Sequence, residues 1–250
     1  MRDLAAVLDT TGWTWERYET LSFPSSTFWL GRDKEGNRWL TKLRGSFRAY
    51  REIVFDRLAQ AMGWSCQSSA FLKLDVQSSI TLGRNSGEVH DAHWFLQEHA
   101  LSPCSDACQL NFLFDRSFAS VDDFQGSKIE HLLDWPKSDF AACLFGANEP
   151  SDRLFTAAHE FVIIDSELMF STGPCRLEGT RWWNLADGNP SPSGRALAAE
   201  VCREFCQLSA ADIQGALWIP DGIKVQKKWP IAPKLTASRA FAAKFLQAHG

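Results

Sequence analysis

The sequence lacks a hydrophobic run long enough to cross a membrane. Its longest apolar stretch lies around Phe140 to Ala147, whereas a membrane-spanning helix needs about 20 apolar residues. The first residues carry acids on both sides of a short apolar stretch and no basic segment, so we expect no signal peptide. The net charge of −4 is small, so the chain as a whole does not bind polyanions through its charge alone.

Several catalytic and repeat signatures are also missing. The sequence contains no G-x-S-x-G nucleophile elbow, no glycine pattern of the Rossmann or Walker A type, and no H-E-x-x-H zinc motif. No repeat at the period of a solenoid or propeller is present. The sequence therefore gives little support to acyl transfer and none to a repeat architecture.

The composition is that of a folded protein. Among 250 residues, 45% are hydrophobic and 22% charged, which excludes wholesale disorder and suits one two-lobed domain or two small ones. Seven scattered cysteines, an odd number, favour a reducing cytoplasm over a disulfide framework. We interpret the eleven tryptophans as core and groove fillers. Residues 221–250 carry a net charge of +5, which is more typical of a solvated C-terminal helix than of a nucleic-acid surface.

The first hundred residues predict strands and one helix. Two apolar segments, 28–30 and 38–43, flank a turn-rich stretch and predict a β-hairpin. Apolar residues then recur at helical spacing from Phe47 to Met62, and Gly63 ends the pattern. Further strands are predicted at 70–74 and 93–97.

The sequence changes in character after Glu98, where helical patterns begin to dominate. The predicted elements of this part are a buried helix over 139–145, a short buried strand over 160–165, and helices over 194–217 and 235–248. We therefore predict an α+β fold with two lobes. Residues 1–98 would form a strand-rich lobe with one key helix, and residues 99–250 a helical lobe.

One ordered series of residues carries a chemical meaning. Lys42 lies in the predicted hairpin, Glu52 on the following helix, and Asp152-Arg153 in a polar loop after a buried helix. Asp165 then ends a short apolar strand. Phosphoryl transfer needs a fixed cation at the ATP phosphates, a carboxylate that positions the attacking hydroxyl, and a carboxylate oxygen for Mg²⁺. The series predicts these three functions in that order.

Three members of the series have a simpler interpretation. Lys42 could be a surface lysine whose aliphatic stem packs on the sheet. Glu52 lies away from the centre of its helix's apolar stripe and could belong to a solvated face. Asp152-Arg153 could be a turn or a local ion pair. The order and spacing therefore carry more weight than any single residue.

The series resembles the HipA-like kinases, which share a two-lobed fold with protein kinases and phosphoinositide kinases. Residues 39–43, followed by Glu52, Leu58-Ala59 and Gly63, resemble the segment with the family's nucleotide lysine and helix glutamate. The resemblance covers about residues 25–170. Residues 93–98 resemble the family's strand that enters the hinge, and residues 147–153 resemble its Asn-Thr-Asp-Arg-His loop. Residues 163–166 resemble its metal-binding Ile-Asp-His.

The resemblance implies a role for each candidate residue in a cleft that holds ATP and Mg²⁺. Lys42 would bind the phosphates and Glu52 would hold Lys42. Asp152 would orient the acceptor, a Ser or Thr hydroxyl of a protein or of the chain itself, and Asp165 would bind the metal. The remaining implied contacts are the backbone at Gln97 and Glu98, which would bind adenine, and Ser25 and Ser26, which replace a glycine-rich loop over the phosphates.

Departures from the family pattern favour an alternative. A kinase catalytic loop has a metal-binding Asn five residues after its Asp, and that position is Ala157 here. Leu154 stands where the family has His, although Asn148, Glu149 and His159 could supply polar groups. A pseudokinase that acts as a protein-interaction or regulatory module is therefore the alternative to an active kinase.

Two other patterns predict different functions. Cys104 with Cys108, and Cys202 with Cys206, could supply four thiolates to zinc in a nucleic-acid-binding protein. On a helix, however, the second pair is also what two small core residues look like. The remaining patterns are Trp182-Trp183, a core anchor or an aromatic wall for a partner, and His90-Asp91-His93, which we interpret as the turn entering a strand rather than a metal pair.

Overall fold

The computed structural model describes ten segments of the chain: residues 7–18, 28–94, 121, 130–147, 152–155, 161–164, 166–185, 189, 191–225 and 230–249. For residues 152–155 and Ile164 it describes the backbone alone.

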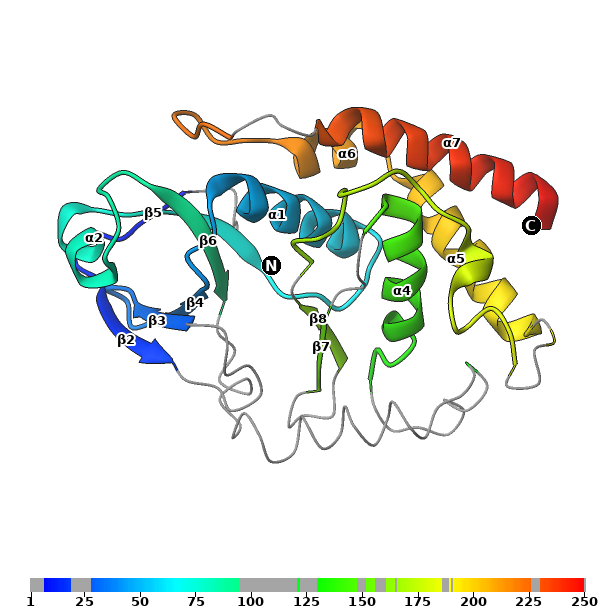
Figure 1. The fold of residues 1–250 in the computed structure, drawn as a ribbon, viewed down its shortest axis with the longest axis horizontal. Helices are drawn as coiled ribbons and strands as arrows, with labels where there is room; N and C mark the ends of the chain where they lie inside the picture. The colour runs from blue at the N-terminus through cyan, green and yellow to red at the C-terminus, as the bar shows by residue number, and fades with distance from the viewer. Residues whose placement is uncertain are drawn as a thin grey trace.

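A six-stranded sheet occupies the N-terminal part, at the left of Figure 1. Its strand order is β1-β5-β6-β4-β3-β2, and all neighbours are antiparallel except the parallel pair β1 and β5. The sheet curls, and it places β6 between β4 and β5 in the middle. The strands are β1 (Leu8–Asp9), β2 (Thr14–Tyr18), β3 (Phe28–Arg32), β4 (Arg38–Thr41), β5 (Ser69–Lys73) and β6 (Val89–Trp94).

The predicted hairpin is confirmed as β3 and β4. The carboxylate of Asp33 accepts the backbone N–H groups of Glu35 and Asn37, which stabilises the turn between the strands. The predicted helix is confirmed as α1 (Ser46–Ala61), and Gly63 follows it at φ 80, a conformation that glycine adopts easily. A short helix, α2 (Val76–Leu82), lies between β5 and β6 and was not predicted.

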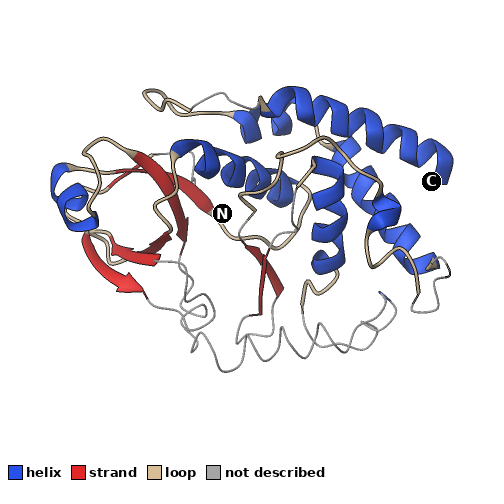
Figure 2. Ribbon diagram, in the orientation of Figure 1, coloured by secondary structure: helices blue, strands red, loops and turns tan. Residues whose placement is uncertain are grey.

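Helices dominate the C-terminal part, as Figure 2 shows. A two-stranded antiparallel hairpin, β7 (Asp152–Phe155) and β8 (Phe161–Ile164), interrupts them. The helices are α4 (Asp134–Phe145), the 3-10 turn η3 (Leu177–Gly179), α5 (Pro192–Gln207), α6 (Ala210–Leu217) and α7 (Ile231–His249). The α+β class is thus confirmed, with the sheet in the N-terminal part and most helices in the C-terminal part.

Helix α1 lies between the sheet and the helices of the C-terminal part (Figure 1). Ala49 and Ile53 pack against Phe71 of β5 in one buried cluster. Phe55 and Leu58 belong to a second, larger cluster that includes α4, α5 and α7. One helix therefore contributes to the cores on both of its sides. The expected division into residues 1–98 and 99–250 falls in a segment outside the described residues and stays a prediction.

Several predicted boundaries are wrong. The helix expected over 194–217 is two helices, because Ser209 and Asp212 form a capping box that starts α6. The helix expected over 139–145 begins at Asp134, since Pro136 fits into the first turn of α4. Asp152-Arg153 was expected in a loop and instead begins β7.

The tryptophan pair is part of the core. Trp182 is 0% exposed and Trp183 6% exposed. The indole N–H of Trp182 donates to Oδ2 of Asp139 over 2.6 Å. The core-anchor interpretation is therefore confirmed, and an aromatic wall open to a partner is excluded because both rings are covered.

Candidate functional site

Lys42 directly follows β4, at the start of the connection to α1. Its backbone N–H donates to Oδ2 of Asp91 over 3.0 Å, and the N–H of Arg44 donates to Oδ1 of the same carboxylate over 2.7 Å. The Lys42 ammonium lies 5.9 Å from the centre of the Phe28 ring on β3. Strand β6, which carries Asp91, therefore fixes the backbone on both sides of Leu43.

Glu52 lies on α1 and is 2% exposed, so its interpretation as a solvated residue is wrong. The spacing of the apolar residues does not predict which residues of this helix are buried, because α1 is covered by the sheet on one side and by helices on the other. Oε2 of Glu52 lies 3.5 Å from Nε2 of His93 on β6. The carboxylate of Glu52 and the backbone N–H of Lys42 thus both contact buried polar side chains of β6.

His93 is at the centre of this group. Its Nε2 lies 3.1 Å from Oδ2 of Asp91, and its Nδ1 lies 2.8 Å from the hydroxyl of Ser69. Asp91 and His93 are both 1% exposed. His90, Asp91 and His93 lie inside β6, so their interpretation as a turn is wrong. We call Glu52, Asp56, Ser69, Asp91 and His93 the buried polar cluster.

The charges in the cluster stabilise one another. Burial alone would lower the pKa of His93, but the charge of Glu52 and the hydrogen bond to Asp91 raise it to about 9. Burial opposes ionisation of Asp91, yet the hydrogen bond and charge of His93 and the amides of Lys42 and Arg44 hold its pKa well below the usual range. At neutral pH, His93 and Asp91 therefore form a buried ion pair.

Asp56 connects α1 to the segment that follows β8. Its Oδ1 accepts the hydroxyl of Ser166 over 3.1 Å, and its Oδ2 accepts the hydroxyl of Ser69. Burial, with the charge of Glu52 added, raises the pKa of Asp56 to about 8. Ser166 is the residue after Asp165, so the chain next to the predicted metal ligand is attached to the buried face of α1.

Strand β8 is attached on both of its edges. Ile163 donates its N–H to the carbonyl of Ser65 over 3.0 Å, and its carbonyl accepts the N–H of Gln67 over 2.9 Å. On the other edge, the β7–β8 register pairs Asp152 with Ile164, the residue before Asp165. The backbone of Asp152 therefore pairs with the residue that precedes Asp165 in the sequence.

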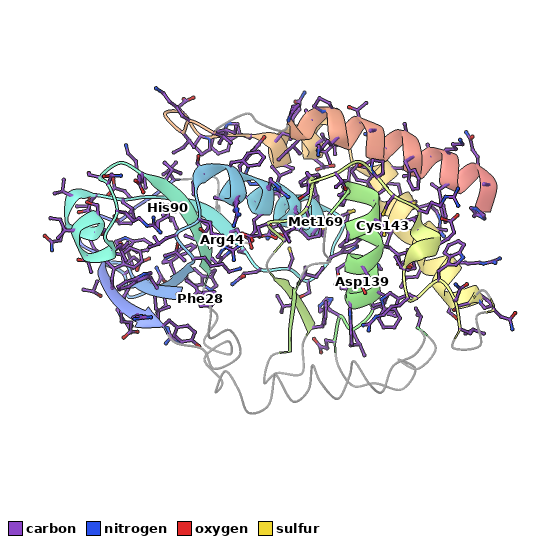
Figure 3. The ribbon with its side chains drawn as sticks, viewed as in Figure 1. Phe28, Arg44, His90, Asp139, Cys143 and Met169 are labelled. Atoms are coloured by element: carbon purple, nitrogen blue, oxygen red, sulfur yellow. The ribbon has the colours of Figure 1, made fainter. Side chains whose placement is uncertain are left out.

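Two arginines attach the segment after β8 to the start of α1. Arg44 forms an ion pair with Glu167, and Nε of Arg51 donates to the carbonyl of Met169 over 2.6 Å. Figure 3 labels Arg44 and Met169, which both lie in the middle of the molecule, between the sheet and α4. The segment from Ser166 to Met169 is therefore anchored to the same helix that carries Glu52.

The remaining candidates are not placed by the structure. The side chain of Asp152 is not described, although its backbone is. The predicted residues that lie outside the described segments are Ser25, Ser26, Gln97, Glu98, Cys104, Cys108, Asn148, Glu149, Ala157, His159 and Asp165.

The described residues contain no group of three or more His, Cys, Asp or Glu side chains that could hold a metal ion. Cys202 is 0% exposed within the core of the helical part, and burial raises the pKa of its thiol to about 12. Its contacts match a core residue better than a zinc ligand. No described helix is both long and apolar enough to cross a membrane.

Sequence reasoning found Lys42 and Glu52 but missed the residues that connect them. Asp56 and Glu52 are one helical turn apart, and Asp91 and His93 are two residues apart on a strand, so each pair shares a face. Polar residues at such spacings usually face water, and only the pairing of β6 between β4 and β5 shows that these are buried. Their positions therefore depend on tertiary structure.

The chain was compared with protein families, curated proteins and solved structures. No protein family matches the sequence, and no curated protein matches it. Among solved structures, the chain is similar to a Helicobacter pylori proinflammatory kinase, CtkA. The similarity covers 96% of this chain and 99% of that one, at 9% identity and a TM-score of 0.46.

Proposed function

We propose that this chain is a HipA-like kinase that transfers the γ-phosphoryl group of ATP to a Ser or Thr hydroxyl of a protein. One observation carries the proposal: the carboxylate of Glu52 on α1 is buried beside the strand that fixes Lys42. A lysine after a sheet strand, supported by a helix carboxylate, is the cation that ATP phosphates require.

In this proposal Lys42 binds the phosphates and Glu52 keeps it oriented. The charge of Lys42 acts on His93, opposing its protonation, so the ammonium lies within electrostatic reach of the buried polar cluster. The cluster itself is closed to solvent and cannot exchange protons with a substrate. Its contribution is to fix charge in place, which is the main source of catalysis in phosphoryl transfer.

A carboxylate such as that of Asp165 offers the oxygen ligands that Mg²⁺ binds. Mg²⁺ is held through one or two carboxylates together with substrate phosphates, so a cage of three protein ligands is not required. Asp165 would hold the ion, which neutralises charge on the phosphates when it is bound. Asp152, whose backbone pairs with Ile164, would orient the acceptor hydroxyl next to it.

A pseudokinase remains the second candidate because of Ala157. The position of β7 makes Ala157 weaker evidence against catalysis, however. Counting five residues from Asp152 passes through the whole of β7 into the connection between Phe155 and Phe161. The spacing of a kinase catalytic loop therefore does not apply from Asp152. The lack of an Asn at 157 does not by itself exclude turnover, and the proposed role of Asp152 rests on its pairing with Ile164 rather than on that spacing.

The proposed acceptor is a protein in the cytoplasm, and a nucleic acid is not favoured. Two of the basic C-terminal residues contact the protein's own backbone. Lys234 donates to the carbonyls of Phe170 and Thr172, and Arg239 donates to the carbonyls of Cys206 and Leu208. These contacts direct two of the charges toward the protein rather than toward an extended anionic ligand.

Label transfer from γ-labelled ATP tests the proposal. With Mg²⁺, we expect the wild-type chain to label itself or a mixture of Ser/Thr-containing peptides, and Asp165→Asn to lose about a hundredfold or more of the rate. Asp221→Asn, which changes an exposed acid in a turn, is the matched control and keeps the wild-type rate.

The outcomes separate the candidates. Transfer lost in Asp165→Asn and kept in Asp221→Asn supports the kinase. Mg²⁺-dependent ATP binding without label transfer supports the pseudokinase. A wild-type chain that neither binds ATP nor transfers label contradicts the kinase and leaves a pseudokinase that acts without the nucleotide.

A further inference from the structure

We infer that Asp91 and His93 are positioning residues that set the direction of Lys42 and of the Glu52 carboxylate. The inference rests on the proposed function, since Lys42 is the proposed phosphate ligand. Neither residue touches the nucleotide in this account. Both act through the backbone and through Glu52, which is a role that neither the sequence nor the comparisons assign to them.

The connection between β4 and α1 has an unusual backbone conformation. Leu43 has φ 53, a left-handed conformation that a leucine rarely adopts. Its side chain is 8% exposed and belongs to a core cluster with Trp39 and Leu72, so a glycine in its place would lose this packing. Strained backbone of this kind persists where surrounding contacts determine it, and such positions concentrate at functional sites.

Hydrogen bonds to the backbone of this connection hold its conformation. Three successive backbone N–H groups, at Lys42, Leu43 and Arg44, all have acceptors. The outer two donate to the two oxygens of the Asp91 carboxylate, and the middle one donates to the hydroxyl of Thr41. Successive amides around a left-handed residue form a concave site for an anion, and here Asp91 occupies it.

The charges around Asp91 and His93 balance one another. The ionisable groups that face His93 are Glu52 and Asp56 on α1, Asp91 on its own strand, and Lys42 after β4. Without a cation among them, the buried carboxylates would repel each other and lose ionisation. Nε2 of His93 lies 3.1 Å from Oδ2 of Asp91 and 3.5 Å from Oε2 of Glu52, so it hydrogen-bonds to the first carboxylate and attracts the second by its charge.

These contacts make one connected path. Glu52 is fixed by His93, His93 by Asp91, and Asp91 holds the backbone of Lys42. The side chain of Lys42 therefore leaves a backbone whose direction β6 determines. A lysine on an unattached loop would have to order its backbone when the phosphates bind, and that ordering would weaken binding.

A double-mutant cycle on ATP binding tests the inference. Calorimetry with Mg²⁺ would compare wild type, Asp91→Asn, Lys42→Met and the double variant, each with ATP and with adenosine. Asn keeps the size of Asp91 but offers one acceptor oxygen in place of two. We expect Asp91→Asn to weaken ATP binding about tenfold or more, as expected for a lost charge-assisted hydrogen bond.

We expect that the effects of Asp91→Asn and Lys42→Met on the free energy of ATP binding do not add. If Asp91 acts through Lys42, the double variant binds ATP as Lys42→Met does, and adenosine affinity is unchanged throughout. Additive losses, or equal losses for adenosine and ATP, would mean a general structural role and would overturn the inference. Asp221→Asn, the same change at an exposed acid in a turn of the C-terminal part, is the matched control and keeps wild-type ATP affinity.

Amide hydrogen exchange separates this inference from the proposed function. In Asp91→Asn we expect the amides of Lys42 and Arg44 to exchange about tenfold faster, while those of Val54 and Phe55 within α1 keep their protection. Unchanged exchange at Lys42 and Arg44 would overturn the inference even where ATP binds. A wild-type chain that binds no ATP overturns the proposed function, and with it the link from Asp91 to a nucleotide.

Discussion

At the scale of single residues, buried ionisable groups define the site. Glu52, Asp56, Asp91 and His93 are each 3% exposed or less. One imidazolium cannot neutralise three carboxylates, and the raised pKa of Asp56, about 8, resolves this by keeping that group neutral at neutral pH. Lys42 lies nearby and completes the balance of charge.

The cluster predicts a pH dependence of stability. The folded-state pKa of His93, about 9, lies above the unfolded value, which is about 6.5. Its stabilisation is therefore complete below the unfolded pKa and is lost as the pH rises through the folded pKa. Asp56 acts in the same direction, because its raised pKa also means that the folded state holds a proton more tightly.

We expect the free energy of unfolding to fall between about pH 6.5 and pH 9, and His93→Gln to reduce that slope. Urea denaturation at several pH values measures both. His249→Gln, at the exposed end of α7, is the control and keeps the wild-type slope. A wild-type profile that is flat over this range would contradict the proposed ionisation of the cluster.

The sequence predicted Lys42 and Glu52 as a pair but not their surroundings. The strand lysine and the helix acid stand in a recognisable order along the chain. The burial of Glu52 could not be predicted, because it depends on how α1 lies between two cores. Asp91 and His93 were interpreted as part of a turn entering a strand, and their partners come from the connection after β4, from β5 and from α1.

At the scale of elements, local patterns were sufficient where an element is long or has strong turn signals. The β3–β4 hairpin and α1 were predicted from turn residues and apolar spacing. Of the β7–β8 hairpin only β8 was predicted, as the strand over 160–165, because the polar Asp152-Arg153 gave no strand signal for β7. Pairing with Ser65 and Gln67 stabilises β8, and that contact spans about a hundred residues of sequence.

The start of α5 gives a prediction at this scale. Gly194 lies in its first turn, where a Cβ would overlap the backbone carbonyl of Trp182. Gly215 of α6 has open space at the same atom. We expect Gly194→Ala to destabilise the chain by about 1–3 kcal/mol, and Gly215→Ala to stabilise it by about 0.5–1 kcal/mol.

Chemical denaturation of the two variants measures the difference. The pair is matched because both are Gly→Ala changes inside helices, so helix propensity favours both equally. Equal stability of the two variants would contradict the close contact between α5 and Trp182.

At the scale of the whole molecule, α1 joins the sheet to the helices. Phe55 of α1 packs edge-to-face on Phe145 of α4 at 6.1 Å between ring centres, and Phe145 packs on Phe205 of α5 at 4.9 Å. The same helix carries Glu52 toward β6 and Arg51 toward Met169. The proposed phosphate ligand and the segment beside Asp165 are thus both attached to α1.

The most direct test of this account is the binding of ATP and Mg²⁺, measured by calorimetry on wild type, Lys42→Met and Lys73→Met. Lys73 is an exposed lysine on β5 and is the matched control. We predict Mg²⁺-dependent binding in the wild type and in Lys73→Met, weakened about tenfold or more in Lys42→Met. Absence of ATP binding in the wild type, or equal binding by all three proteins, would contradict the assignment of Lys42 to a nucleotide site.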